Sequence, residues 1–251
     1  MTTAALVALM APLGCEREPA APSSVASARS VDESVRAVEQ YLAQGRMREA
    51  RVISARLVEV EPGNATVREV HARVLLSEAL VDHPEGRARD AALGEAAEAY
   101  LVALSLDREN AALHHAAGVA LDQSGRSTES LELYNRACLL DPTQAQYELY
   151  AAMALRRLMR LDEARARLDR AAMLSPDEPL VAILRSDVAL ASDRPSEALE
   201  EAQRARRLAP GELAARIAES RALRALGRHA ECAEMLLALP RASRTNEAIA
   251  S

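Results

Sequence analysis

Residues 145–178 read AQYELYAAMALRRLMRLDEARARLDRAAMLSPDE, a unit of thirty-four residues whose residue types recur along most of the chain. Blocks in the same register begin at Val31, Ala111, Ala145, Pro179 and Leu213. A fixed period of about 20 to 50 residues marks a supersecondary unit that stacks on further copies of itself. The sequence therefore predicts an array of stacked repeats.

Position 15 of the block is expected to end a first helix. Glycine occupies it at Gly45, Gly125 and Gly227, and glycine readily adopts the left-handed conformation found just after a helix. Met159 and Asp193 stand at the same position in two other blocks. The pattern predicts a tight turn here, followed by a second helix.

Positions 20 and 32 indicate how the second helix packs and where it ends. Small residues recur at position 20, where we expect the second helix to cross the first: Ala50, Ser130, Ala164, Ala198 and Cys232. Position 32 holds Pro62, Pro142, Pro176 and Pro210. Proline lacks an N–H group and clashes with the preceding turn, so it stops the second helix.

This register resembles the tetratricopeptide repeat, from about Val31 to Leu239. The resemblance implies an all-α fold, a right-handed α-solenoid of about six antiparallel helix pairs spanning residues 31–240. The family often has an aromatic residue at position 4, and this chain departs from that pattern. Position 4 carries Ser34, His114, Glu148, Ala182 and Arg216, and the chain contains no Trp or Phe. Leu, Ala, Val and Tyr must therefore fill the core.

One block, residues 65–110, is longer than the others and predicts a long helical hairpin. The additional residues lie near Ser77 to Glu95, with His83-Pro84-Glu85-Gly86 as the turn. Two interpretations stay open for its apolar residues Ala79, Leu80, Ala91 and Leu93: they pack on one another, or they contact a partner.

Composition and charge favour a helical protein without nucleic-acid binding. Hydrophobic residues make up 49% of the chain and aromatic residues only 2%. Ala and Leu, the strongest helix formers, account for most of the hydrophobic excess. A net charge of −6 and the scarcity of stacking aromatics argue against a nucleic-acid surface.

The sequence shows no catalytic residues and no metal-ligand motif. The five histidines lack an H-E-x-x-H pattern, and His114 and His115 would project about 100° apart on one helix. Without Lys there is no phosphate-binding loop of the G-K-[ST] type, and no G-x-S-x-G motif occurs. We therefore expect no enzymatic activity, no cofactor and no small-molecule substrate.

The first thirty residues follow a different pattern. A short apolar run, Ala4 to Leu13, precedes Gly14-Cys15, and residues 16–30 are rich in Pro, Ala and Ser and read as a disordered tether. Residues 1–15 resemble a bacterial lipoprotein signal, which implies acylation of Cys15 and a protein anchored at the outer membrane and facing the periplasm. The alternative is a disordered tail with an incidental cysteine on a cytoplasmic protein. Residues 241–251 are expected to form a C-terminal tail.

In tetratricopeptide arrays the first helices of the pairs line a concave, peptide-binding groove. Carried over to this register, the groove consists of an apolar strip with a rim of arginines: Leu149, Tyr150, Met153, Arg156, Arg157, Leu180, Ile183, Asp187, Ile217, Arg221 and Arg224. Such a surface suits an amphipathic or acidic peptide. The alternative is that Leu149, Ile183 and Ile217 seal one repeat against the next.

The expected function is a non-catalytic scaffold that binds a protein or peptide partner. The acylated cysteine, the short tether and the six repeats together resemble the lipoproteins that pilot a type IV pilus secretin to the outer membrane. The alternative is a cytosolic regulatory or assembly module.

Overall fold

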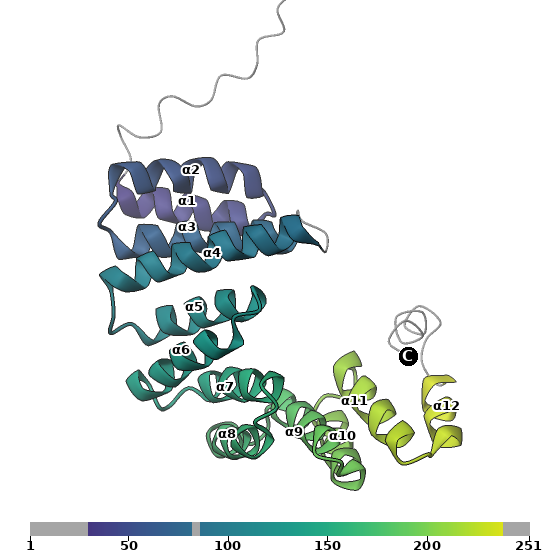
Figure 1. Ribbon diagram of the computed structural model, residues 1–251. Helices are drawn as coiled ribbons and strands as arrows, with labels where there is room; N and C mark the ends of the chain where they lie inside the picture. The colour runs from purple at the N-terminus through teal and green to yellow at the C-terminus, as the bar shows by residue number, and fades with distance from the viewer. Residues whose placement is uncertain (1–29, 82–85, 238–251) are drawn as a thin grey trace, which may run out of the picture.

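The computed structural model describes residues 30–81 and 86–237, which form twelve α-helices joined by short turns and no strands (Figure 1). The helices are α1 (Val31–Ala43), α2 (Met47–Val60), α3 (Ala65–Val81), α4 (Arg87–Leu106), α5 (Ala111–Gln123), α6 (Ser127–Leu140), α7 (Ala145–Arg157), α8 (Leu161–Leu174), α9 (Pro179–Ala191), α10 (Pro195–Leu208), α11 (Leu213–Ala225) and α12 (His229–Leu237).

The helices form six antiparallel pairs that follow one another in chain order. Figure 1 shows α1 to α6 stacked in layers, after which the array bends through α7 to α10 towards α11 and α12. Each pair packs mainly on its neighbours in sequence, as expected for a solenoid. The predicted all-α repeat architecture is confirmed, and every repeat block begins at the first residue of a helix.

The turn inside five of the six pairs has one backbone geometry. Position 15 lies in the left-handed region at Gly45, Gly125 and Gly227, and also at Met159 (φ 58°) and Asp193 (φ 57°). Around Met159, the N–H of Met159 donates to the Arg156 carbonyl at 3.0 Å and that of Arg160 to the Leu155 carbonyl at 2.9 Å. This is the Schellman pattern, which satisfies the last carbonyls of the first helix.

An ion pair that the sequence analysis did not identify follows each of these turns. Position 16 is always Arg and position 19 always Glu, and the two side chains approach to between 2.6 and 3.2 Å. The pairs are Arg46–Glu49, Arg126–Glu129, Arg160–Glu163, Arg194–Glu197 and Arg228–Glu231. The glutamate also lies in the first turn of the second helix, where a negative charge is favourable.

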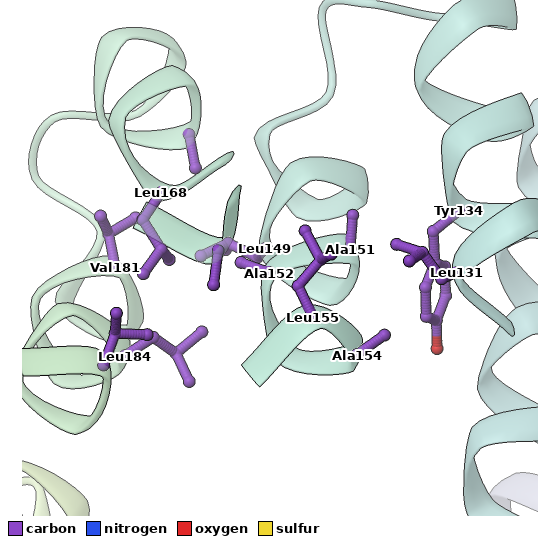
Figure 2. Close-up of a cluster of buried hydrophobic side chains, with 13 residues drawn as sticks. Leu131, Tyr134, Leu149, Ala151, Ala152, Ala154, Leu155, Leu168, Val181 and Leu184 are labelled. Atoms are coloured by element: carbon purple, nitrogen blue, oxygen red, sulfur yellow. The ribbon is translucent and has the colours of Figure 1, made fainter. Parts of the chain in front are cut away.

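The core runs along the interior of the array and is closely packed at position 20. Ala50, Ser130, Ala164 and Ala198 have no exposed surface. Figure 2 shows one buried cluster in which Leu131 and Tyr134 of α6 face residues of α7, which in turn contact α8 and α9. A Cβ atom on Gly118 of α5 would come within 2.6 Å of the Tyr134 ring, so glycine permits this contact.

Helices α3 and α4, with 17 and 20 residues, are longer than the other ten. Of the four apolar residues considered for this hairpin, Ala79 and Leu93 are buried, whereas Leu80 and Ala91 are exposed. The expectations for the turn at 82–85, for Cys15 and the tether, and for the tail at 241–251 concern residues outside the described ranges.

Met159→Gly should raise the free energy of unfolding by about 0.5–1 kcal/mol, because a left-handed conformation costs an L-residue roughly 1–2 kcal/mol and glycine gives part of that back as lost entropy. Met159 is 67% exposed, so its removal costs little packing. Urea unfolding monitored by circular dichroism measures the change.

Asp193→Gly is the matched variant, and its gain should be smaller because Asp tolerates the left-handed region better than Met. A Met159→Gly protein that unfolds at a lower urea concentration than the wild type would contradict the argument.

Candidate partner-binding surface

Two of the predicted groove residues are buried in the core. Leu149 of α7 is 4% exposed and belongs to the cluster drawn in Figure 2, and Ile183 of α9 is 8% exposed and packs among alanines of α10 and α11. Both therefore seal neighbouring helices, which was the alternative interpretation, and neither offers a side chain to a partner.

The other apolar residues of the predicted groove reach the surface. Tyr150, Met153 and Ile217 are half-buried, and Leu180 is exposed. Tyr150 and Met153 pack on the same core cluster as Val119 of α5. Their inner sides are thus fixed by the core while their outer sides stay accessible.

Two arginines of the expected rim are held by acidic residues of the protein itself. Arg157 lies 2.6 Å from the Oδ2 atom of Asp122, a carboxylate whose side chain is 5% exposed. Arg221 lies 2.6 Å from Asp187, which is itself one of the predicted groove residues. Each pair joins two successive first helices, so these guanidinium groups stabilise the stack as well as facing solvent.

Arg156 and Arg224 differ from these two. Arg156 is half-buried and Arg224 is exposed. Neither forms an ion pair with any carboxylate of residues 30–81 or 86–237. These two side chains are the rim cations that a partner could neutralise.

An aromatic cluster lies beside the strip. The ring of His115 of α5 meets Tyr150 of α7 edge-on, with 4.6 Å between centroids, and lies 5.2 Å from Tyr147 and 5.9 Å from Tyr134. Tyr134 and Tyr150 are 5.7 Å apart. Three of the five tyrosines of the chain thus gather at one place.

Burial sets the electrostatics of this cluster. It lowers the pKa of His115 and raises that of Tyr134. The Nε2 atom of His115 and the hydroxyl of Tyr134 have no hydrogen-bond partner among the described residues. The imidazole is therefore neutral at neutral pH and forms part of an apolar surface.

We call His115, Val119, Tyr150 and Met153 the central strip. Its two ends along position 9 are charged: Glu39 and Arg73 pair at 2.8 Å in the first two repeats, and Asp187 and Arg221 pair in the last two. Val119 and Met153 occupy position 9 between them. An apolar and aromatic segment is thus enclosed by ion pairs on the face formed by the first helices.

The central strip shares Tyr150 and Met153 with the groove expected from the sequence. His115 and Val119 stand at positions 5 and 9 of their block, the same positions as Leu149 and Met153, so the register also assigns them to this face.

The described residues contain neither a metal-ligand cluster nor a helix suited to span a membrane. Within the described part of the chain, no three His, Cys, Asp or Glu side chains are grouped as metal ligands would be. Over the same residues, no helix combines the length and the apolar character that crossing a bilayer requires.

Comparison with known proteins identifies the fold. No model of a protein family matches the sequence, and no curated protein matches it. Many solved structures match, among them PilF of Pseudomonas aeruginosa, with a TM-score of 0.67 and 17% identity over 88% of this chain and 97% of that one. The protein has the fold of the tetratricopeptide repeat proteins.

Two further structures show the same architecture. PilW, described as a widely conserved type IV pilus biogenesis factor, gives a TM-score of 0.70 with 17% identity over 82% of this chain and 90% of that one. YrrB, described as a tetratricopeptide repeat protein with an unusual peptide-binding site, gives 0.59 with 17% identity over 74% and 90% of the two chains.

His115→Phe should make the protein relatively more stable at acidic pH. The folded pKa of His115 is lowered by burial, so its stabilising contribution is complete above the unfolded value of about 6.5 and is lost as the pH falls through that value. Phe keeps a ring in the cluster and removes the titration. As the pH is lowered from about 7.5 to about 5.5, the melting temperature of the variant should therefore fall less than that of the wild type.

The other histidines are present in both proteins, including His71, whose pKa burial also lowers, so their effects cancel in the difference. Parallel pH profiles for wild type and His115→Phe would show that the His115 imidazole is not desolvated in the folded state.

Proposed function

We propose that this protein is a non-catalytic scaffold that binds a segment of a partner protein on the central strip. One observation carries the proposal: in a chain with 2% aromatic residues, Tyr150 and His115 lie with Val119 and Met153 on a face bounded by ion pairs. Aromatic residues and Met are enriched at protein interfaces, and Met adapts to the shape of what it contacts.

The chemistry of the strip favours an apolar partner segment with few charges. Because Arg157 and Arg221 are neutralised by Asp122 and Asp187, they supply little attraction for an acidic peptide. Arg156 and Arg224 remain to pair with one or two carboxylates at the edge of the segment. An amphipathic peptide whose apolar side covers Tyr150 and Met153 fits this arrangement.

The proposed location is the outer membrane of a bacterium, with the solenoid in the periplasm and Cys15 acylated. The Gly14-Cys15 pair and the Pro/Ala/Ser-rich residues 16–30 support this location. Similarity in fold to PilF and PilW over most of the chain makes assembly of a type IV pilus or its secretin the favoured setting. The alternative setting is a cytosolic assembly complex, in which Cys15 has no role.

The binding surface is tested by incorporating a photoreactive amino acid at position 153 of the full chain. The protein is expressed in the organism that naturally produces it. A crosslinked partner is expected from position 153, because Met153 is accessible at the middle of the strip. Position 173 is the matched control, since Met173 is 82% exposed but lies on a second helix. The same partner crosslinked equally from both positions, or from neither, would move the site away from the strip.

Cys15→Ser tests the anchor separately. If Cys15 is acylated, the wild type should fractionate with the membrane and the variant should be released into the soluble periplasmic fraction, because a serine side chain cannot form the thioether. Immunoblots of the two fractions measure this. Equal distribution of both proteins would refute the lipoprotein anchor and leave the scaffold proposal intact.

A further inference from the structure

A hollow of about 440 Å³ lies between the end of α4, the beginning of α5 and α6. Its apolar lining is Leu101 and Leu104 of α4, and His114 of α5 forms another side. Arg108, Glu109 and Arg136 surround it and are exposed to solvent.

The hollow is separate from the central strip. His114 and His115 are neighbours in α5, and adjacent residues of a helix project about 100° apart. His115 contacts the tyrosines of the strip, whereas the His114 ring bonds through Nε2 to the Arg108 carbonyl, 2.9 Å away, in the turn before α5. The two histidines therefore belong to two different surfaces of the same helix.

Comparison with the next repeat explains why the hollow exists. In the fourth pair, position 4 is Glu148, which is 8% exposed because Arg167 and Arg170 both reach it at 3.0 Å. In the third pair, position 4 is His114, and the arginine equivalent to Arg170 is Arg136.

Arg136 pairs instead with Glu109, at 2.9 Å, and not with position 4. Arg167 and Arg170 close this place in the fourth pair. In the third pair Arg136 turns to Glu109, and the place stays open. His114, unlike Glu148, offers no carboxylate to the arginine of the second helix, and Leu133 stands where the next repeat has Arg167.

Part of the apolar lining is open to solvent, because Leu101 is only half-buried. An accessible apolar recess can serve as a contact for another molecule.

Charge identifies the kind of molecule. Arg136 is neutralised by Glu109, but within residues 30–81 and 86–237 no carboxylate forms an ion pair with Arg108. The apolar hollow is therefore bordered by one uncompensated cation.

We propose that the hollow is a second binding site, which takes one apolar side chain of a partner protein together with a neighbouring Asp or Glu. The apolar side chain, of the size of Leu, Met or Phe, contacts Leu101 and Leu104. The carboxylate pairs with Arg108. This site is independent of the partner proposed for the central strip.

The experiment is selection of twelve-residue peptides displayed on phage against the purified full chain, followed by binding measurements with the synthetic peptides. Ser105→Trp is the test variant, because Ser105 lines the hollow, is exposed and would be replaced by a side chain that fills it. Met153→Glu is the matched control, which alters the central strip and leaves the hollow unchanged.

We expect enrichment of peptides that carry an apolar residue beside Asp or Glu, and that bind wild type and Met153→Glu equally but Ser105→Trp at least about tenfold more weakly. Replacing the acidic residue of such a peptide by its amide should weaken binding by about fivefold, the size expected for one exposed ion pair. Arg108→Glu should have a similar or larger effect without changing the thermal melt, so the proposal stays testable if Ser105→Trp does not fold.

Three results would overturn the proposal. They are the absence of any enriched peptide, enrichment only of peptides that bind Ser105→Trp as well as the wild type, and equal binding of the acidic and amide peptides to the wild-type protein.

Discussion

The close approach of the two helices in each pair is the constraint on which the rest of this structure depends. At position 20 the second helix crosses the first with Ala50, Ser130, Ala164 or Ala198 fully buried between them. Larger side chains there would force the backbones apart, because a close-packed interior has no space to absorb added methylene groups. Since each pair rests on the preceding one, a wider crossing would also shift every surface built across two pairs, including the central strip.

The turn at position 15 complements this crossing by fixing the angle at which the second helix returns. Met159 and Asp193 adopt the same left-handed conformation as the glycines, so the surrounding repeat imposes the turn even where the residue disfavours it. The Arg–Glu pair after each turn reinforces it. Such exposed ion pairs are individually weak because solvent screens them, but the same contact occurs in five pairs of the array.

Much of the fold could be predicted from the sequence because its determinants are local. Proline at position 32 and the small residue at position 20 act within one block, and the helices α5, α7, α9 and α11 begin where the blocks at Ala111, Ala145, Pro179 and Leu213 begin. The candidate binding surface was harder to predict, because it depends on how one pair rotates against the next. That rotation buries Leu149 and Ile183 and leaves Tyr150 and Met153 accessible, although all four lie on first helices.

The arginine rim was hard to predict for the same reason, because its ion pairs join one repeat to the next. Arg157 and Asp122 are thirty-five residues apart, and only their positions 13 and 12 in successive blocks indicate that they could meet. Comparing neighbouring positions of successive blocks, rather than each block alone, would also have suggested the pair Asp187–Arg221, since both residues stand at position 9. In a repeat protein, charge can therefore be judged only after the residues one repeat away have been taken into account.

Departures from the repeat, rather than its regular positions, give this protein its distinctive surfaces. Where position 4 holds Glu148, arginines of α8 close the place, and where it holds His114, a hollow remains. One residue later, His115 replaces the aliphatic residues of the fourth, fifth and sixth blocks and draws Tyr150 into an edge-on contact. Both departures lie on α5, and the small Gly118 of that helix admits the Tyr134 ring of α6 within the third pair. The third pair thus carries two chemically different surfaces on a single helix.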